Sequence, residues 1–273
     1  MTSNWTALAF NQAPDAPNEI HGDKVAREFG FKGGLVLGAA IGAYITHPAV
    51  ESWGKDFLSS GRAHVKIVSP LYDGEAFAVE TTDLSPTRYR ASLFRPDRTV
   101  SATAEVHLAE PEALAAPPAL RGDPIGDKDT AAVAATPENM AVLKEKGCHA
   151  SRFRWRDGHS LASYLKVSAE MPPLLRVGAY GNGFANMSFI LGCSNVVLAR
   201  AVHMNPWVLL ETTSQNYAPI ALDTRLIAEL EVLEFYNKKG HEFVDARVNL
   251  FNADSGLCHC SIDKRAIYQL RGM

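Results

Sequence analysis

Residue types that could transfer protons lie close together near the start of the chain. Asn18, His21 and Asp23 fall within one short segment, and Asp15 precedes them by three positions. Imidazole and carboxylate groups are common in general acid–base catalysis, and imidazole titrates near neutral pH. We therefore take residues 15–23 as the candidate site.

Two of these residues also have ordinary structural interpretations. Asp23 precedes a predicted helical turn at residues 25–29, where the helix dipole favours an acidic side chain. A histidine at position 21 also suits a purely structural role, in which its ring hydrogen-bonds the surrounding loop. Both interpretations stay open beside the chemical one.

Two segments rich in small residues are the predicted helices that position this site. Residues 35–45 are mostly glycine, alanine and branched apolar residues, and the His47-Pro48 pair is predicted to end this helix. Residues 187–202 have a similar composition. Small side chains let a helix approach a sheet closely. The predicted antiparallel strands are 62–69, 74–83, 88–95, 99–108, 207–217, 223–235, 241–251 and 257–268.

The order of motifs in the first half is repeated in the second. A strand interrupted by Pro70 is followed by another strand, and the same pattern surrounds Pro219. The turn Leu93-Phe94-x-x-Asp97-x-x-Val100 is matched by Leu250-Phe251-x-x-Asp254-x-x-Leu257. These matches favour an internal duplication. The alternative is that unrelated antiparallel sheets share proline breaks and aspartate turns.

A proline- and alanine-rich stretch from 109 to 146 separates the copies and is predicted to be a connector. Within it, Thr136 and Pro137 are expected to cap and open a short helix.

Each copy is thus a long helix with an antiparallel sheet around it, which is the hotdog architecture. We predict an α+β fold of two tandem hotdog domains. They are residues 1–110 and 148–273, with a linker at 111–147, and they pack sheet edge to sheet edge.

Residues 18–38 resemble the MaoC-like, or (R)-specific enoyl-CoA hydratase (hydratase 2), family. That family's motif is Asp-x-Asn-Pro-Ile/Leu-His-x-Asp-x-x-x-Ala-x-x-x-Gly-Phe, with Ile-Val-His-Gly shortly after it. The matching residues are Asn18, Ile20, His21, Asp23, Ala26 (one position early), Gly30, Phe31 and Gly38.

The resemblance implies that His21 acts as a base on a water molecule that adds to an enoyl thioester. It also implies that Gly38 donates a backbone N–H to the thioester carbonyl and that Asn18 orients the histidine. Asp15 would be the catalytic carboxylate and Asp23 a substrate-binding residue. The chain is thereby predicted to be a lyase, an enoyl-CoA hydratase or dehydratase of fatty acid metabolism.

The sequence departs from the family motif at the catalytic acid. Ala16 stands where the aspartate belongs, and Asp15 lies one position earlier between Pro14 and Pro17. A one-residue bulge would bring Asp15 inward, whereas the prolines could equally hold it outward. Glu19 replaces the motif proline and Leu37 the later histidine. The second half has no Asn-x-x-His counterpart and is therefore predicted to be degenerate.

Two other functions remain open. The stretch from Phe31 to Val36, with Gly33 and Gly34, is similar to the helix start of hotdog thioesterases, which would place an acid at the start of the 35–45 helix. A non-catalytic acyl-thioester-binding protein would have a pocket without an acid–base pair. Architecture alone does not decide among these.

Composition gives no support for a nucleic-acid-binding protein or a membrane-spanning protein. A net charge of −3 gives no argument for nucleic acid, and no apolar run reaches the roughly 18 residues of a membrane span. The N-terminus lacks a secretory pattern, so we expect a cytoplasmic protein, either a monomer or a homodimer. Cys258-His259-Cys260 is predicted to be strand packing and not a metal site, and no cofactor is expected. The predicted partner is an acyl-CoA or acyl-carrier thioester.

Overall fold

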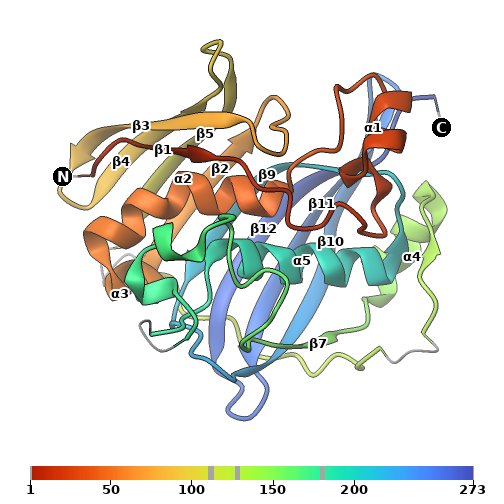
Figure 1. Cartoon of the computed structure of the whole chain (residues 1–273). Coiled ribbons are helices and arrows are strands. Elements are labelled where there is room, and N and C mark those ends of the chain that lie inside the picture. Colours follow the sequence, from red (N-terminus) through yellow and green to blue (C-terminus); the bar gives the residue numbers. More distant parts are fainter. Residues whose placement is uncertain (1, 110–113, 127–129, 179–181, 273) are drawn as a thin grey trace.

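The computed structural model describes residues 2–109, 114–126, 130–178 and 182–272. Among these residues, ten antiparallel strands form one sheet, in the order β1-β3-β4-β5-β2-β9-β12-β11-β10-β7 (Figure 1). The first half supplies β1 (Trp5–Leu8), β2 (Gly61–Ile67), β3 (Ala76–Ser85), β4 (Arg88–Phe94) and β5 (Val100–Leu108). The second half supplies β7 (Ser151–Arg154), β9 (Val208–Asn216), β10 (Arg225–Lys238), β11 (His241–Asn252) and β12 (Cys258–Gln269).

The two halves repeat one topology and meet at the pair formed by β2 and β9. Read outward from this pair, the order is β2-β5-β4-β3-β1 on one side and β9-β12-β11-β10-β7 on the other, so each strand has a counterpart. In the pairing register, Ala63 lies opposite Ser214 and Val65 lies opposite Thr212. The predicted duplication and edge-to-edge packing are thus both observed. The eight predicted strands are present, whereas the short outer strands β1 and β7 were not predicted.

Two long helices lie side by side on one face of the sheet, α2 (Gly38–Trp53) in the first half and α5 (Met187–Ala201) in the second (Figure 1). The prediction for α5 is confirmed. The prediction that His47-Pro48 ends the first helix is wrong, because α2 continues through Pro48. A proline in a helix leaves the carbonyl four residues earlier without its usual donor. Here the Trp5 indole N–H donates to the Tyr44 carbonyl over 3.2 Å and satisfies it.

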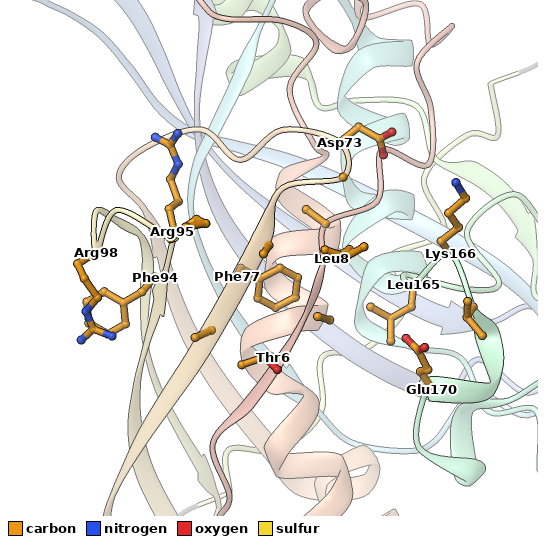
Figure 2. Close-up of a pocket in the computed structure, with 17 residues that line it drawn as sticks. Thr6, Leu8, Asp73, Phe77, Phe94, Arg95, Arg98, Leu165, Lys166 and Glu170 are labelled. Carbon is orange, nitrogen blue, oxygen red and sulfur yellow. The ribbon is translucent and has the colours of Figure 1, made fainter.

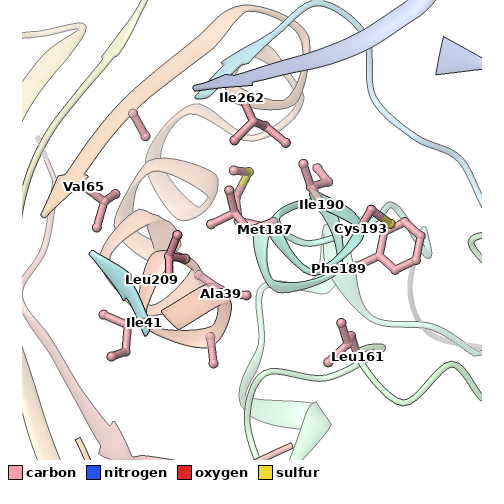
Figure 3. Close-up of a cluster of buried hydrophobic side chains, with 14 of the residues drawn as sticks. Ala39, Ile41, Val65, Leu161, Met187, Phe189, Ile190, Cys193, Leu209 and Ile262 are labelled. Carbon is pink, nitrogen blue, oxygen red and sulfur yellow. The ribbon is translucent and has the colours of Figure 1, made fainter. Parts of the chain in front are cut away.

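The core lies where these helices meet each other and the central strands. Figure 3 shows Ala39 of α2 and Met187 of α5 between the two helices, with Leu209 of β9 beside α2. The small residues allow this approach. A Cβ on Gly42 would come within 2.5 Å of Leu191 Cδ1 across the helix pair, and one on Gly192 within 2.4 Å of Leu161 Cδ1.

Shorter elements connect these parts. They are the 3-10 helices η1 (Glu19–His21), η2 (Ser168–Glu170) and η3 (Pro173–Leu175), the helices α1 (Asp23–Glu28), α3 (Lys55–Ser60) and α4 (Pro137–Lys146), and the parallel pair β6 (Val133–Ala134) and β8 (Val202–His203). As predicted, Thr136 caps α4, and its hydroxyl accepts the Asn139 N–H at 3.2 Å.

The connector between the halves is attached to the second half by a buried carboxylate. Glu229 of β10, 1% exposed, accepts the backbone N–H groups of Arg121, Gly122 and Asp123 at 2.7–3.0 Å. The predicted domain boundary at residues 110 and 111 lies outside the described residues. No helix in the described ranges is long and apolar enough to cross a membrane.

Candidate active site

The imidazole of His21 is held in one tautomer by the backbone. Its Nδ1 lies 2.8 Å from the carbonyl oxygen of Leu35, which can only accept, so Nδ1 carries the hydrogen. Nε2 then carries the lone pair and accepts a hydrogen bond from Asn18 Nδ2 at 3.4 Å. Burial lowers the pKa of His21 below its ordinary value, and the Leu35 carbonyl opposes this less strongly. The ring is therefore a neutral imidazole whose Nε2 can accept a proton.

Asn18 links this histidine to the second half of the chain. Its Nδ2 donates to the Trp207 carbonyl over 3.0 Å, and its Oδ1 accepts the Trp207 N–H over 3.1 Å. These two bonds define which way the amide faces, so that Nδ2 also lies on the side of His21. The orienting role of Asn18 stays a prediction, and its amide lies beside the His21 ring.

Asn18, His21 and Gly38 line one cavity of about 280 Å³ between the two halves. Its lining is mostly apolar and comprises Asn18, Ile20, His21, Phe31, Leu35, Val36, Gly38, Ile41, Ile67, Val68, Ser69, Pro70, Asn195, Trp207, Val208, Leu209, Leu210, His241, Ile267 and Leu270. None of these described lining residues carries a carboxylate. The cavity suits an apolar chain with a proton acceptor at one side.

The N-terminus of α2 faces this cavity without a side-chain cap. Leu37 is the N-cap residue and makes no capping bond, and Gly38 lines the cavity. Pro219 follows Pro70 by 149 positions, and Asn186 follows Leu37 by the same number. Asn186 caps its own helix, because its Oδ1 accepts the Phe189 N–H at 3.1 Å. Of these two equivalent helix ends, the first therefore keeps free N–H groups available to an anionic or carbonyl oxygen.

Gly34 is a positioning residue that the sequence analysis did not identify. A Cβ at this position would lie 2.1 Å from the His21 carbonyl oxygen, so only glycine fits here without moving backbone. The adjacent Leu35 N–H donates to Ile20 over 3.0 Å. Residues 34 and 35 therefore hold the His21 segment from behind. The Gly33-Gly34 pair was the available signal.

The two predicted aspartates lie outside the cavity. Asp23 accepts the Gly34 N–H at 2.9 Å and contacts Arg27 at 2.9 Å, so it ties α1 to the loop behind His21. Asp15 is exposed and has no hydrogen bond or ion pair with any described residue. Both line an open depression of about 730 Å³, which His21 also borders. The structure thus brings His21, Asn18 and Gly38 together in the cavity, whereas the two acids share with His21 only the open depression outside it.

A buried lysine near the cavity was also missed. Lys264 of β12 is 3% exposed, and its Nζ contacts Asn195 Oδ1 and, at 3.5 Å, Ser194 Oγ. Burial lowers the pKa of Lys264 to about 7. Cys260 and Ile262 precede it on the same face, so a lysine in this alternating apolar pattern was the signal.

Cys258 and Cys260 are buried, as free cysteines commonly are.

A larger depression of about 780 Å³ lies elsewhere, beside the edge strand β1 (Figure 2). It has an apolar floor that includes Leu8 and Phe77. Two arginines at its side are already paired, Arg95 with Glu75 at 2.7 Å and Arg98 with Glu80 at 2.5 Å. It does not include His21, and its two arginines are committed to neighbours.

No protein-family model matches the chain, and no curated protein matches it. Solved structures do. A candidate thioesterase from Novosphingobium aromaticivorans is 14% identical, with 98% of this chain and 96% of that chain covered and a TM-score of 0.59. A conserved protein of Mycobacterium tuberculosis, described as having a double hotdog fold, is 11% identical (97% and 96% covered, TM-score 0.57). The dehydratase domain of RzxB from Pseudomonas fluorescens is 11% identical (96% and 93% covered, TM-score 0.52).

These likenesses extend over nearly the whole chain and show the fold. The protein is a double hotdog, and the predicted α+β fold class is confirmed. The matched proteins are described as having different activities, so the function of this chain has to be argued from its own site.

Proposed function

We propose that this protein is an acyl-thioester hydratase or dehydratase of the MaoC-like kind, in which His21 transfers the protons. The observation that carries the proposal is the fixed tautomer of His21. It presents Nε2 as an acceptor at the wall of an apolar cavity that is also bordered by the uncapped start of α2.

In this mechanism the acyl chain occupies the cavity and the thioester carbonyl accepts the backbone N–H of Gly38. His21 Nε2 takes a proton from water as the water oxygen bonds to the β-carbon of the enoyl group. The electron pair of the double bond moves toward the carbonyl oxygen, where the helix N-terminus stabilises the negative charge. The imidazolium then returns the proton to the α-carbon, which completes hydration. Dehydration is the reverse.

One imidazole performs both transfers in this scheme. Asn18 Nδ2 donates to Nε2 in this structure, so the water takes the place of that bond, and the carboxamide cannot exchange a proton. Asp15 stays an untested prediction for the second acid–base group. Its exposed position gives it no part in the mechanism, so it enters the experiment as a variant. The proposal specifies a thioester substrate and does not choose between CoA and an acyl carrier protein as its carrier.

Non-catalytic acyl binding is the second candidate, and the lack of a carboxylate among the described cavity residues favours it. The thioesterase alternative required an acid at the start of the first-half helix. The first turn of α2 contains none.

The test is the loss of enoyl-thioester absorbance with crotonyl-CoA and a longer trans-2-enoyl-CoA, with free thiol measured in parallel. We expect absorbance loss without thiol, and a reduction of about 10²–10⁴-fold in His21→Gln. Asp15→Ala should keep most activity, as should the control His203→Gln, which changes an exposed histidine. Thiol release would indicate a thioesterase. Binding of substrate without either signal would indicate a binding protein.

A further inference from the structure

Lys264 occupies a position where the repeated fold places an apolar residue. It lies opposite Thr212 of β9, seven residues before Pro219. The first-half residue equivalent to Thr212 is Ala63, which lies seven residues before Pro70, and Ala63 lies opposite Val106. Val106 is therefore the first-half equivalent of Lys264. Val106 is fully buried. The second half therefore has an ammonium group where the first half has an isopropyl group.

No carboxylate of the described residues is in contact with this ammonium group. Its contacts in the described structure are the Asn195 carboxamide, the Ser194 hydroxyl and the Trp207 ring, whose centroid lies 5.2 Å from Nζ. The neighbouring residues Asp263 and Arg265 alternate to the outer face of the sheet. There Asp263 pairs with Arg247 at 2.6 Å and Arg265 with Asp245 at 2.7 Å. Buried charges are normally paired, so this lysine lacks the partner that a purely structural role would supply.

Two of the groups that touch Lys264 also form the wall of the His21 cavity. Asn195 and Trp207 both line it, on the second-half side, whereas His21 and Gly38 line it from the first half. An acyl chain in this cavity can therefore contact Asn195, and Lys264, which does not itself line the cavity, contacts the same side chain through its Nζ.

We propose that Asn195 and Lys264 form a recognition site for a carboxylate at the far end of the acyl chain, so that the preferred substrates are thioesters of dicarboxylic acids. This inference rests on the proposed acyl-thioester function. A terminal carboxylate would supply the missing counter-ion, because it would accept hydrogen bonds from Lys264 Nζ and Asn195 Nδ2. Charge-assisted bonds of this kind are about twice as strong as neutral ones.

The experiment compares two ligands that differ at the chain end alone, hexanoyl-CoA and adipoyl-CoA, by isothermal titration calorimetry. We expect wild type to bind adipoyl-CoA at least about tenfold more tightly. Lys264→Met keeps an unbranched side chain, one atom shorter, and removes its charge, so it should abolish the preference while hexanoyl-CoA binding is kept. Lys66→Met, on a lysine whose side chain is 54% exposed, is the control and should keep the preference.

A second measurement needs no variant. Because the Lys264 pKa is about 7, binding of a carboxylate near neutral pH should draw a proton onto the amine. The calorimetric enthalpy should then depend on the ionisation enthalpy of the buffer for adipoyl-CoA but not for hexanoyl-CoA. The Ser194, Asn195 and Trp207 side chains in contact with Lys264 do not titrate in this range. Two histidines, His21 and His241, line the same cavity, and the hexanoyl-CoA titration measures their contribution.

The outcomes separate the two proposals. Equal binding of the two ligands, or a preference for hexanoyl-CoA, would overturn the carboxylate site and leave the acyl-thioester function standing. A preference that survives in a folded Lys264→Met variant would also overturn it. Absence of binding by both ligands would reject the acyl-thioester function and this inference together.

Discussion

The side-chain amide of Asn18 makes two hydrogen bonds to the backbone of Trp207, one in each direction, at 3.0 and 3.1 Å. Asn18 belongs to the His21 segment of the first half, and Trp207 directly precedes the central strand β9 of the second. Because Trp207 also lines the cavity, the position of His21 relative to the opposite wall depends on this pair.

Asn18→Ala should therefore affect both stability and activity. It leaves the Trp207 N–H and carbonyl without these partners, which should lower the free energy of unfolding by about 1–3 kcal/mol. Urea denaturation measures this loss. Asn237→Ala, on an exposed side chain, should change stability by less than about 0.5 kcal/mol. Equal effects of the two variants would contradict a special role for the Asn18 pair.

The pH dependence of the reaction should follow the lowered pKa of His21. The base must be neutral to accept a proton, and burial extends its neutral form below the ordinary histidine pKa of about 6.5. Hydration measured as kcat/KM should thus persist as pH falls through 6.5 and decline only at a lower pH. A profile that falls with a midpoint above 6.5 would be inconsistent with His21 as the base.

Stability should decrease on mild acidification. Five described histidines have lowered pKa values, chiefly through burial: His21, His47, His107, His159 and His259. Above pH 6.5 both folded and unfolded forms are neutral. Below it the unfolded chain binds protons first, so the free energy of unfolding falls as pH falls.

Thermal denaturation between pH 7.5 and 5 measures this effect, in a range where most carboxylates stay ionised. His47→Gln should flatten the dependence of Tm on pH, because it removes one buried titrating group. His203→Gln, on an exposed residue, should leave the slope unchanged. A Tm that is constant or rises toward pH 5 would show that the buried histidines do not dominate the pH dependence of stability.

Gly34→Ala should disrupt the site from behind. The new Cβ would come within 2.1 Å of the His21 carbonyl oxygen, so backbone must move and the Nδ1 bond to Leu35 is disturbed. We expect loss of hydration by at least about tenfold, since small misplacements of catalytic groups reduce rates strongly. In Gly126→Ala the nearest atom to the new Cβ would be the His149 Cβ at 3.3 Å, so this variant serves as the control for the substitution. Full activity of Gly34→Ala would remove Gly34 from the positioning role.

Glu229→Gln should weaken the attachment of the connector. Both carboxylate oxygens of Glu229 accept backbone N–H groups. In the glutamine variant one of these oxygens is replaced by an NH2 group, which is itself a donor and cannot accept the backbone N–H. The expected loss is about 1–3 kcal/mol in urea denaturation. Glu231→Gln, with a side chain 51% exposed and 3.8 Å from Arg121, should cost less than about 1 kcal/mol. Similar losses in both variants would argue against a stabilising role for the buried Glu229 carboxylate.

The sequence predicted the large elements well, because strand alternation and helix composition are local signals. The strands around Pro70 and Pro219 and the cap at Thr136 are where they were expected. The course of α2 beyond Pro48 was not predictable, since it depends on Trp5, which is distant in the chain and donates to the Tyr44 carbonyl. β1 was missed because it is four residues long.

The candidate site divides in the same way. His21, Asn18 and Gly38 were predicted from the resemblance of residues 18–38 to the MaoC-like motif, and they share one cavity. The placement of Asp15 was not determined by spacing, because the prolines beside it allow either direction. Asn195, Trp207 and Lys264 could not be connected to His21 from the sequence, since the cavity joins residues almost the whole chain apart.

The pairing of β2 with β9 in one polypeptide has a consequence for how such a site can change. In a homodimer of identical hotdog subunits, every substitution appears twice, so a lysine useful on one wall would also be forced into the other. A covalent fusion removes that symmetry constraint. Here Val106 and Lys264, and likewise Leu37 and Asn186, have diverged at equivalent positions. Each half has been free to mutate alone, so one can specialise in the reaction while the other specialises in choosing what reacts.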